Sequence, residues 1–268
     1  MRLSLLEAIF LGVVQGVTEF LPISSSGHLV LFQRILGLEE GALTFDILLH
    51  FGTLLAVFAV YWRDILAILR NPFGKMGRLI LAGTIPTVAI GLLFKDYFDT
   101  LFASGATIGA EFLITGAVIW WADAARNGGK GEREMSYGDA LLVGTLQGAA
   151  ILPAISRSGL TICGALFRGL DREFAAKYSF LMSVPVILGA NLMEIKDMLE
   201  GSAPGAVGGI GLAEILGTLA AAVAGYVAIK YMIRLIVSKG MRMFAWYVWI
   251  LGGLILFDQI VSNMYFHF

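Results

Sequence analysis

Residues 12–27 read GVVQGVTEFLPISSSG, and residues 144–159 read GTLQGAAILPAISRSG. Aligned without gaps, the two stretches are identical at seven of sixteen positions. In the numbering of the first stretch, the matches are Gly12, Gln15, Gly16, Ile23, Ser24, Ser26 and Gly27. This repetition predicts a chain made of two related halves, about 1–125 and 138–268, within a single domain.

The composition indicates that this domain lies in a membrane. Hydrophobic residues make up 58% of the 268 residues, and charged residues only 15%, whereas a soluble domain is about 25% charged. The net charge of -1 gives no electrostatic reason to expect a nucleic-acid partner. The single cysteine, Cys163, excludes a disulfide framework or a cysteine-based metal site within the chain.

The apolar segments predict six membrane-spanning helices. A helix needs about 20 mostly apolar residues to cross a bilayer. The segments that qualify are 45–62, 79–95, 106–122, 178–195, 212–232 and 244–262. The linkers rich in Lys and Arg are 63–78, 123–138 and 233–243, and the positive-inside rule places them in the cytoplasm. Each half therefore has three crossings, and the two halves are expected to have opposite orientations, as an inverted repeat.

Each repeated stretch predicts a helix, a break and a second short helix, at roughly 5–36 and 141–167. Proline, serine and glycine cause the breaks. Because neither arm is long enough to span comfortably, we predict two re-entrant helix-loop-helix hairpins. Non-helical backbone at membrane depth is tolerated only where protein or a water-filled cavity covers it. The two breaks are therefore the expected functional site.

Polar side chains gather at these breaks, and ionisable groups at this depth are functional candidates. The first break offers Gln15, Glu19, Ser24, Ser25, Ser26, Gly27 and His28. The second offers Ser156, Arg157, Ser158, Gly159 and Thr161. Serine and glycine before a helix leave backbone N–H groups free, and the helix dipole favours an anion there. With a planar guanidinium beside them, two such helix ends predict a cradle for phosphate or diphosphate.

The repeat alignment also shows where the halves differ. Ser25 aligns with Arg157, while Glu19 and His28 align with apolar residues. One half thus offers a hydroxyl, a carboxylate and an imidazole, and the other offers a cation. This division suits phosphoryl transfer, with a nucleophile on one side and charge stabilisation on the other.

The stretches QGVTEFLPISSSGH (15–28) and LPAISRSGLT (152–161) resemble the signatures of the bacterial undecaprenyl-diphosphatase family, which is associated with bacitracin resistance. The resemblance covers essentially the whole chain. It implies hydrolysis of undecaprenyl diphosphate to undecaprenyl phosphate and inorganic phosphate, which recycles the carrier lipid for peptidoglycan synthesis. It also implies a multi-pass protein of the bacterial plasma membrane, with an active site open to the extracytoplasmic side.

The resemblance also implies roles for individual residues. Ser25 would be the nucleophile, Arg157 the transition-state clamp, and His28 the group that orients or activates the serine or moves a proton. Glu19 would be a base or a ligand for Mg²⁺ or Ca²⁺, with Gln15 as a weaker ligand. The expected substrate-binding residues are Gln15, Ser24, Ser26, Gly27, Ser156, Ser158, Gly159 and Thr161. Ala154 replaces the usual glycine of the family pattern and removes no functional group.

Several alternatives stay open at this stage. Inverted repeats with broken helices are also the architecture of secondary transporters, so a lipid flippase or solute transporter competes with the phosphatase. Arg157 could be only a structural partner of Glu19. His50 is expected to be a packing residue or to line the site, and Glu111 to be interfacial. The sequence does not choose between Ser25 and water as the attacking group, or between a monomer and a homodimer.

Overall fold

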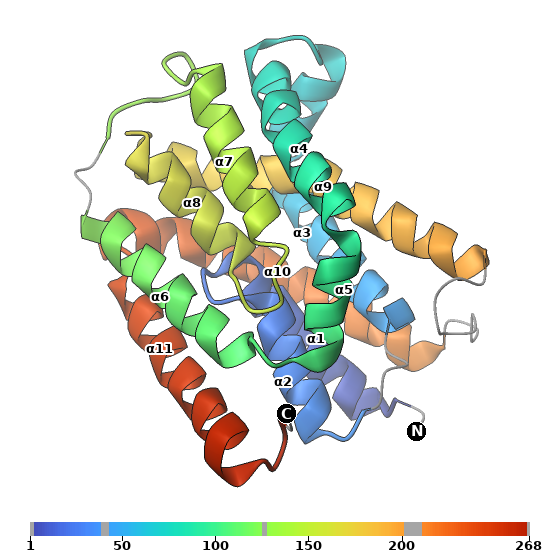
Figure 1. Cartoon of the computed structure of the whole chain (residues 1–268). Coiled ribbons are helices and arrows are strands. Elements are labelled where there is room, and N and C mark those ends of the chain that lie inside the picture. Colours follow the sequence, from blue (N-terminus) through green and yellow to red (C-terminus); the bar gives the residue numbers. More distant parts are fainter. Residues whose placement is uncertain (1–2, 39–42, 125–127, 201–210, 267–268) are drawn as a thin grey trace.

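A computed structural model describes residues 3–38, 43–124, 128–200 and 211–266. Its regular structure is helical (Figure 1), which confirms the predicted all-α class. The helices are α1 Leu5–Phe20, α2 Ser25–Ile35, α3 Leu43–Arg70, α4 Lys75–Leu93, α5 Lys95–Ser104, α6 Ile108–Ala124, α7 Tyr137–Ala149, α8 Arg157–Phe167, α9 Arg172–Leu199, α10 Leu212–Ser238 and α11 Arg242–Phe257. A π-helical turn, Asp258–Ser262, extends α11.

Five of these helices are long and apolar enough to cross a membrane. The candidate spans are Thr44–Arg70, Lys75–Leu93, Arg172–Lys196, Leu212–Ser238 and Arg242–Ser262. The remaining predicted span, 106–122, falls on α6, which passes the same test only together with α5. The two helices meet at an angle of 111°. Counting that bent pair as one span gives the six predicted crossings.

The first helix of each predicted hairpin begins with the same cap. The Ser4 hydroxyl accepts from the N–H of Glu7, and the Glu7 carboxylate accepts from the N–H of Ser4. Ser136 and Asp139 form the same capping box at the start of α7. Such a box satisfies two N–H groups that have no partner within the helix. The second box lies in the register of the sequence repeat and supports the duplication, although the re-entrant course and the inverted orientation stay predictions.

The repeated glycines allow each of these helices to lie against a helix from the other half. Helix α1 packs along α10, and α7 packs along α4. A side chain on Gly12 would run into the backbone carbonyl of Gly217, and one on Gly144 into that of Gly83. Small residues permit this close backbone approach in membrane helices. Gly12 and Gly144, which occupy matching positions of the repeat, therefore have a packing role.

Asp139 pairs with Lys130 of the basic linker 123–138 and with Arg168, which directly follows α8. Asp139 accepts from Lys130 at 3.4 Å and from Arg168 at 2.6 Å. Burial raises the pKa of Asp139, but the hydrogen bonds from the Ser136 N–H and from Arg168 outweigh it and lower the pKa to about 2. The Asp139 carboxylate therefore stays ionised, and its ion pair with Arg168 holds the start of α7 to the end of α8. Arg126, also counted in that basic linker, lies outside the described residues.

Candidate active site

The two predicted breaks lie against each other. Helix α1 ends at Phe20 and α2 begins at Ser25, while α7 ends at Ala149 and α8 begins at Arg157. The hydroxyls of Ser24 and Ser26 donate to the carbonyl of Pro153, at 3.3 and 2.6 Å. In return, Ser158 donates to the carbonyl of Leu21, at 2.9 Å. In Figure 1 the yellow-green pair α7–α8 accordingly reaches the blue pair α1–α2.

The two helices that follow the breaks begin with matching caps. The Ser24 hydroxyl accepts from the N–H of Gly27 at 3.3 Å, and the Ser156 hydroxyl accepts from the N–H of Gly159 at 3.0 Å. The N–H groups of the first residues, such as Ser25 and Arg157, have no acceptor within their own helix. Two helix N-termini, whose first N–H groups have no acceptor within their own helix, therefore lie side by side, which is an arrangement that binds anions.

Ser24 has a backbone conformation that is rare for a serine. Its φ of 65° and ψ of 104° place it in a region that costs a non-glycine residue about 1–3 kcal/mol. The hydrogen bonds around Ser24 hold it there, since its hydroxyl bonds Gly27 and Pro153. This conformation turns the chain sharply just before the proposed nucleophile, Ser25.

Glu19 connects the serine of one break to the arginine of the other. One carboxylate oxygen accepts from the Ser25 hydroxyl, and the second accepts from Nη2 of Arg157. Gln15 donates to the same carboxylate at 3.1 Å. The Glu19 residue is only 6% exposed. Within the described part of the chain, buried Nη1 of Arg157 and Oε1 of Gln15 have no hydrogen-bond partner.

This arrangement has the parts of an activated nucleophile. A hydroxyl bonded to a carboxylate can transfer its proton as the oxygen attacks. Nη1 of Arg157 is a donor that remains free for an anionic oxygen, since Glu19 occupies only Nη2. The fork of an arginine and the N–H groups of two helix ends can stabilise negative charge at the attacked atom.

Three other hydroxyls of the site donate hydrogen bonds to backbone carbonyls of the protein. Ser26, Ser158 and Thr161 each donate to a backbone carbonyl, those of Pro153, Leu21 and Arg157. A hydroxyl has a single proton, and a phosphate oxygen needs a donor. The hydroxyl protons of these three side chains are thus used within the protein, and their predicted role as phosphate ligands stays a prediction. Ser26 and Ser158 join the two breaks, whereas Thr161 bonds within α8.

His28 bonds neither Ser25 nor Glu19. Its Nδ1 lies 2.6 Å from the carbonyl oxygen of Ser24, and its Nε2 lies 2.8 Å from the hydroxyl of Tyr247. A carbonyl only accepts, so Nδ1 carries the proton, and in the neutral ring Nε2 accepts from Tyr247. Of the roles predicted for His28, this geometry fits that of orienting the serine, because the ring bonds the backbone that precedes Ser25. The carboxylate that bonds the Ser25 hydroxyl is that of Glu19.

Replacing Tyr247 by phenylalanine is expected to lower kcat by about three- to tenfold with little change in KM. The change leaves Nε2 of the buried His28 ring without its partner, which loosens the support of Ser24. The measurement is steady-state phosphate release. Tyr231→Phe on α10, where the tyrosine is 56% exposed, should leave both parameters unchanged. A loss beyond about a thousandfold would instead indicate a direct catalytic role for Tyr247.

A sequence model of the family described as "Bacitracin resistance protein BacA" matches residues 8–254. The chain belongs to the BacA family. Its relatives include the undecaprenyl-diphosphatase of Carboxydothermus hydrogenoformans, which is 51% identical over 258 residues, 96% of this chain and 98% of the relative. The undecaprenyl-diphosphatase 3 of Bacillus cereus is 49% identical, with coverage of 96% and 98%. That of Halothermothrix orenii is 47% identical, with coverage of 95% and 98%. The resemblance seen in the sequence motifs is confirmed.

Two further residues support the second break of this BacA chain. Glu111 accepts from the N–H of Ala154 at 2.6 Å and is only 4% exposed, so it packs inside the protein, and its expected interfacial depth stays a prediction. Thr115 donates to the carbonyl of Ala154 and accepts from the N–H of Ser156. Glu111 and Thr115 are four residues apart, as Gln15 and Glu19 are. The same search for polar pairs on one helix face could have found them.

His50 bonds within its own helix. Its Nδ1 lies 2.8 Å from the carbonyl of Asp46 on its own helix, and the ring is near enough to Glu19 to interact electrostatically. Gln33 donates to the Asp46 carboxylate at 2.9 Å. His50 therefore packs within α3, and the lining of the site by its ring stays a prediction.

The site offers few oxygen ligands for a metal ion. Among the described residues there is no group of three or more His, Cys, Asp or Glu side chains suited to a metal. Glu19 and the unpaired Oε1 of Gln15 are the available oxygens. Mg²⁺ is often held by one or two carboxylates together with substrate phosphates and water. The BacA site therefore fits a cation that binds together with a diphosphate.

Proposed function

We propose that this chain hydrolyses undecaprenyl diphosphate to undecaprenyl phosphate and inorganic phosphate. The observation that carries the proposal is the bridge from Ser25 through Glu19 to Arg157, set between two helix N-termini. The family and the names of the relatives support the substrate. The several candidate spans support an enzyme whose substrate is itself a membrane lipid.

In the proposed reaction the Ser25 oxygen attacks the terminal phosphorus while Glu19 takes its proton. The bond from that phosphorus to the bridging oxygen breaks, and undecaprenyl phosphate leaves with the bridging oxygen. Arg157 stabilises the charge on the transferred phosphoryl group through Nη1. Glu19 then releases its proton to the departing undecaprenyl phosphate or to water. In the second step Glu19 takes a proton from the attacking water, the bond from phosphorus to the Ser25 oxygen breaks, and Glu19 returns the proton to that oxygen as inorganic phosphate forms. Two easier steps replace one difficult step.

We also propose that Mg²⁺ or Ca²⁺ binds with the substrate, held by Glu19 and Gln15. When bound, the cation would neutralise part of the diphosphate charge. A chelator should then reduce phosphate release by the wild-type enzyme, and adding back the metal should restore it. Release that is unaffected by a chelator would exclude this part of the proposal.

The cellular setting is proposed on the distribution of charge. The basic residues at the end of α3 and the start of α4, and those around the junction of α10 and α11, favour the cytoplasmic side. We place the protein in the bacterial plasma membrane, with the site open to the extracytoplasmic side, where it recycles the carrier lipid for peptidoglycan and confers bacitracin resistance. One chain supplies Ser25, Glu19 and Arg157, so a homodimer is not required for the chemistry.

The test is a phosphate-release assay with purified protein in detergent. The wild type should release inorganic phosphate from undecaprenyl diphosphate far faster than the Ser25→Ala, Arg157→Ala double variant. The same assay in vesicles, with the lipid followed between leaflets, addresses the transporter alternative. Movement of the lipid without cleavage of the anhydride would overturn the proposed hydrolysis.

Replacing Glu19 by glutamine is expected to lower kcat by about a hundredfold or more. Glutamine keeps the shape of the side chain, but it cannot accept the proton of Ser25. The measurement is kcat with undecaprenyl diphosphate over a range of pH. Glu173→Gln, at an exposed position in the first turn of α9, is the matched control and should have wild-type kcat. A Glu19→Gln enzyme within about tenfold of the wild type would rule out Glu19 as the base.

A further inference from the structure

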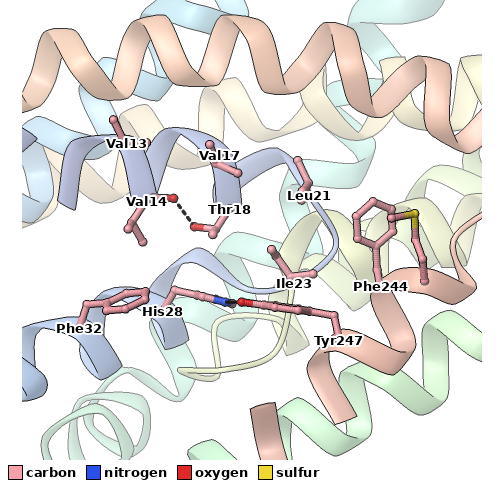
Figure 2. A pocket seen from close by; sticks show the side chains of 11 residues that line it. Val13, Val14, Val17, Thr18, Leu21, Ile23, His28, Phe32, Phe244 and Tyr247 are labelled. Atoms are coloured by element: carbon pink, nitrogen blue, oxygen red, sulfur yellow. Dashed lines mark hydrogen bonds between the residues drawn. The ribbon is translucent and has the colours of Figure 1, made fainter. Parts of the chain in front are cut away.

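An apolar groove runs along the hairpin of α1 and α2 where α11 lies beside it (Figure 2). Its volume is about 450 Å³. Its walls include Val17 and Leu21 of α1 and the break, Phe32 of α2, and Phe244 and Tyr247 of α11. Val17 is 36% exposed and Tyr247 is 45% exposed, so the groove opens at the surface of the protein. On a helix bundle in a membrane, that surface faces lipid.

The groove shares its wall with the proposed reaction centre. Leu21 lies two residues after Glu19, and Ile23 lies two residues before Ser25, so each pair of Cα atoms is within about 8 Å. His28 contributes its imidazole to the groove and bonds the carbonyl of Ser24. Figure 2 shows this ring and Tyr247 end to end along the groove. The segment that carries the nucleophile therefore also forms the side of an apolar channel.

The chemistry of a polyprenyl diphosphate requires such a surface. The prenyl chain begins at the second phosphate, only a few bonds from the attacked phosphorus. When the terminal phosphate lies between Ser25 and Arg157, the first isoprene units must lie against protein close to Ser25. We propose that the groove between α1, α2 and α11 binds these first isoprene units, an inference that rests on the proposed function.

The size of the groove fits a short part of the chain. An apolar cavity of about 150 Å³ holds a benzene molecule, so 450 Å³ corresponds to about three five-carbon isoprene units. The rest of an undecaprenyl chain would stay in the bilayer. The first few units would therefore be recognised, and the total length of the chain would matter little.

The groove would orient the substrate more than it would attract it. Lipid acyl chains are as apolar as the groove, so moving a prenyl chain from the bilayer into the groove gives little hydrophobic gain. What the groove supplies is close packing against a branched chain, which fixes the direction from which the diphosphate reaches Ser25. The proposed effect is thus on kcat/KM for substrates long enough to fill the groove.

The first test compares two substrates of different length on a variant whose groove is filled by a larger side chain. Farnesyl diphosphate has three isoprene units, and dimethylallyl diphosphate has one. Val17→Phe is expected to lower the ratio of their kcat/KM values, farnesyl over dimethylallyl, by about tenfold, since added bulk in a packed site is poorly accommodated. The matched control, Val223→Phe at a 67% exposed position of α10, should leave the ratio at the wild-type value. An unchanged ratio in a folded Val17→Phe enzyme overturns the proposal.

The second test uses the wild-type chain and does not depend on a variant. A prenyl diphosphate with a diazirine on its third unit is cross-linked in vesicles, and labelled peptides are mapped by mass spectrometry. Label on residues 13–17 or 243–247, prevented by undecaprenyl phosphate, supports the proposal. Label elsewhere, or equal protection by phosphatidylglycerol, shows that the groove takes ordinary lipid and overturns it. If the wild type releases no phosphate from undecaprenyl diphosphate, the proposed function fails, and this labelling still decides the groove.

Discussion

Replacing Ser25 by alanine is expected to reduce phosphate release from undecaprenyl diphosphate by about 10⁴-fold or more. The Ser25 hydroxyl at the start of α2 donates to Glu19, and its oxygen is the proposed attacking group. Alanine removes that oxygen and keeps the helix. The measurement is kcat in detergent, together with a rapid-quench search for phosphoserine at position 25 in the wild type.

Ser26→Ala provides the neighbouring control. Its hydroxyl donates to the Pro153 carbonyl, so its loss should weaken the contact between the breaks and lower kcat by no more than about tenfold. A Ser25→Ala enzyme that keeps several per cent of its activity, with inversion at an isotopically labelled phosphorus, would mean that water attacks directly.

Replacing Arg157 by lysine is expected to lower kcat by about a thousandfold. In the structure one nitrogen of the guanidinium bonds Glu19 while Nη1 remains unpaired. An ammonium group keeps the charge and can still pair with the carboxylate. It lacks the planar fork that allows arginine to bond Glu19 and a phosphoryl oxygen together. The lysine variant therefore separates the catalytic role of Arg157 from a purely structural one.

The measurement combines kcat with the thermal midpoint of unfolding. Arg157→Lys should unfold near the wild-type temperature, because the buried charge keeps its partner. Arg168→Lys, at the ion pair with Asp139, is the matched control and should have nearly wild-type kcat. If Arg157→Lys also turned over at the wild-type rate, Arg157 would be only the structural partner of Glu19.

The sequence was informative wherever a property is local or periodic. Span length, hydropathy and the repeated Pro–Ser–Gly breaks predict the helices and identify the two segments that meet. The contact of Glu19 with Arg157 depends on how residues 138 positions apart pack, and composition and periodicity carry no record of that. The motif resemblance brought these two residues together by analogy, and the structure supplies the hydrogen bonds.

The hydrogen-bond partners of the site residues are what the sequence could not predict. The motif resemblance implied that His28 orients or activates Ser25 or moves a proton. In the structure the Ser24 carbonyl, at a residue of positive φ, lies at Nδ1, and Tyr247, which is 219 residues away, bonds Nε2. The hydroxyls of Ser26 and Ser158 likewise find acceptors in the opposite break. Such partners are fixed by tertiary packing.

The mutual hydrogen bonds of the two breaks also bear on how the protein is made. Within the first break, the Leu21 carbonyl accepts from the N–H of Ile23 and the Ser24 hydroxyl accepts from the N–H of Gly27. A growing chain emerges from its N-terminus, so this break enters the bilayer before Ser158 and Pro153, the partners that lie in the second half, have been made. Insertion of the second half completes the hydrogen bonds of the first break. A chain truncated after the first half is therefore expected to be less stable in the bilayer. Catalytic activity requires the complete fold.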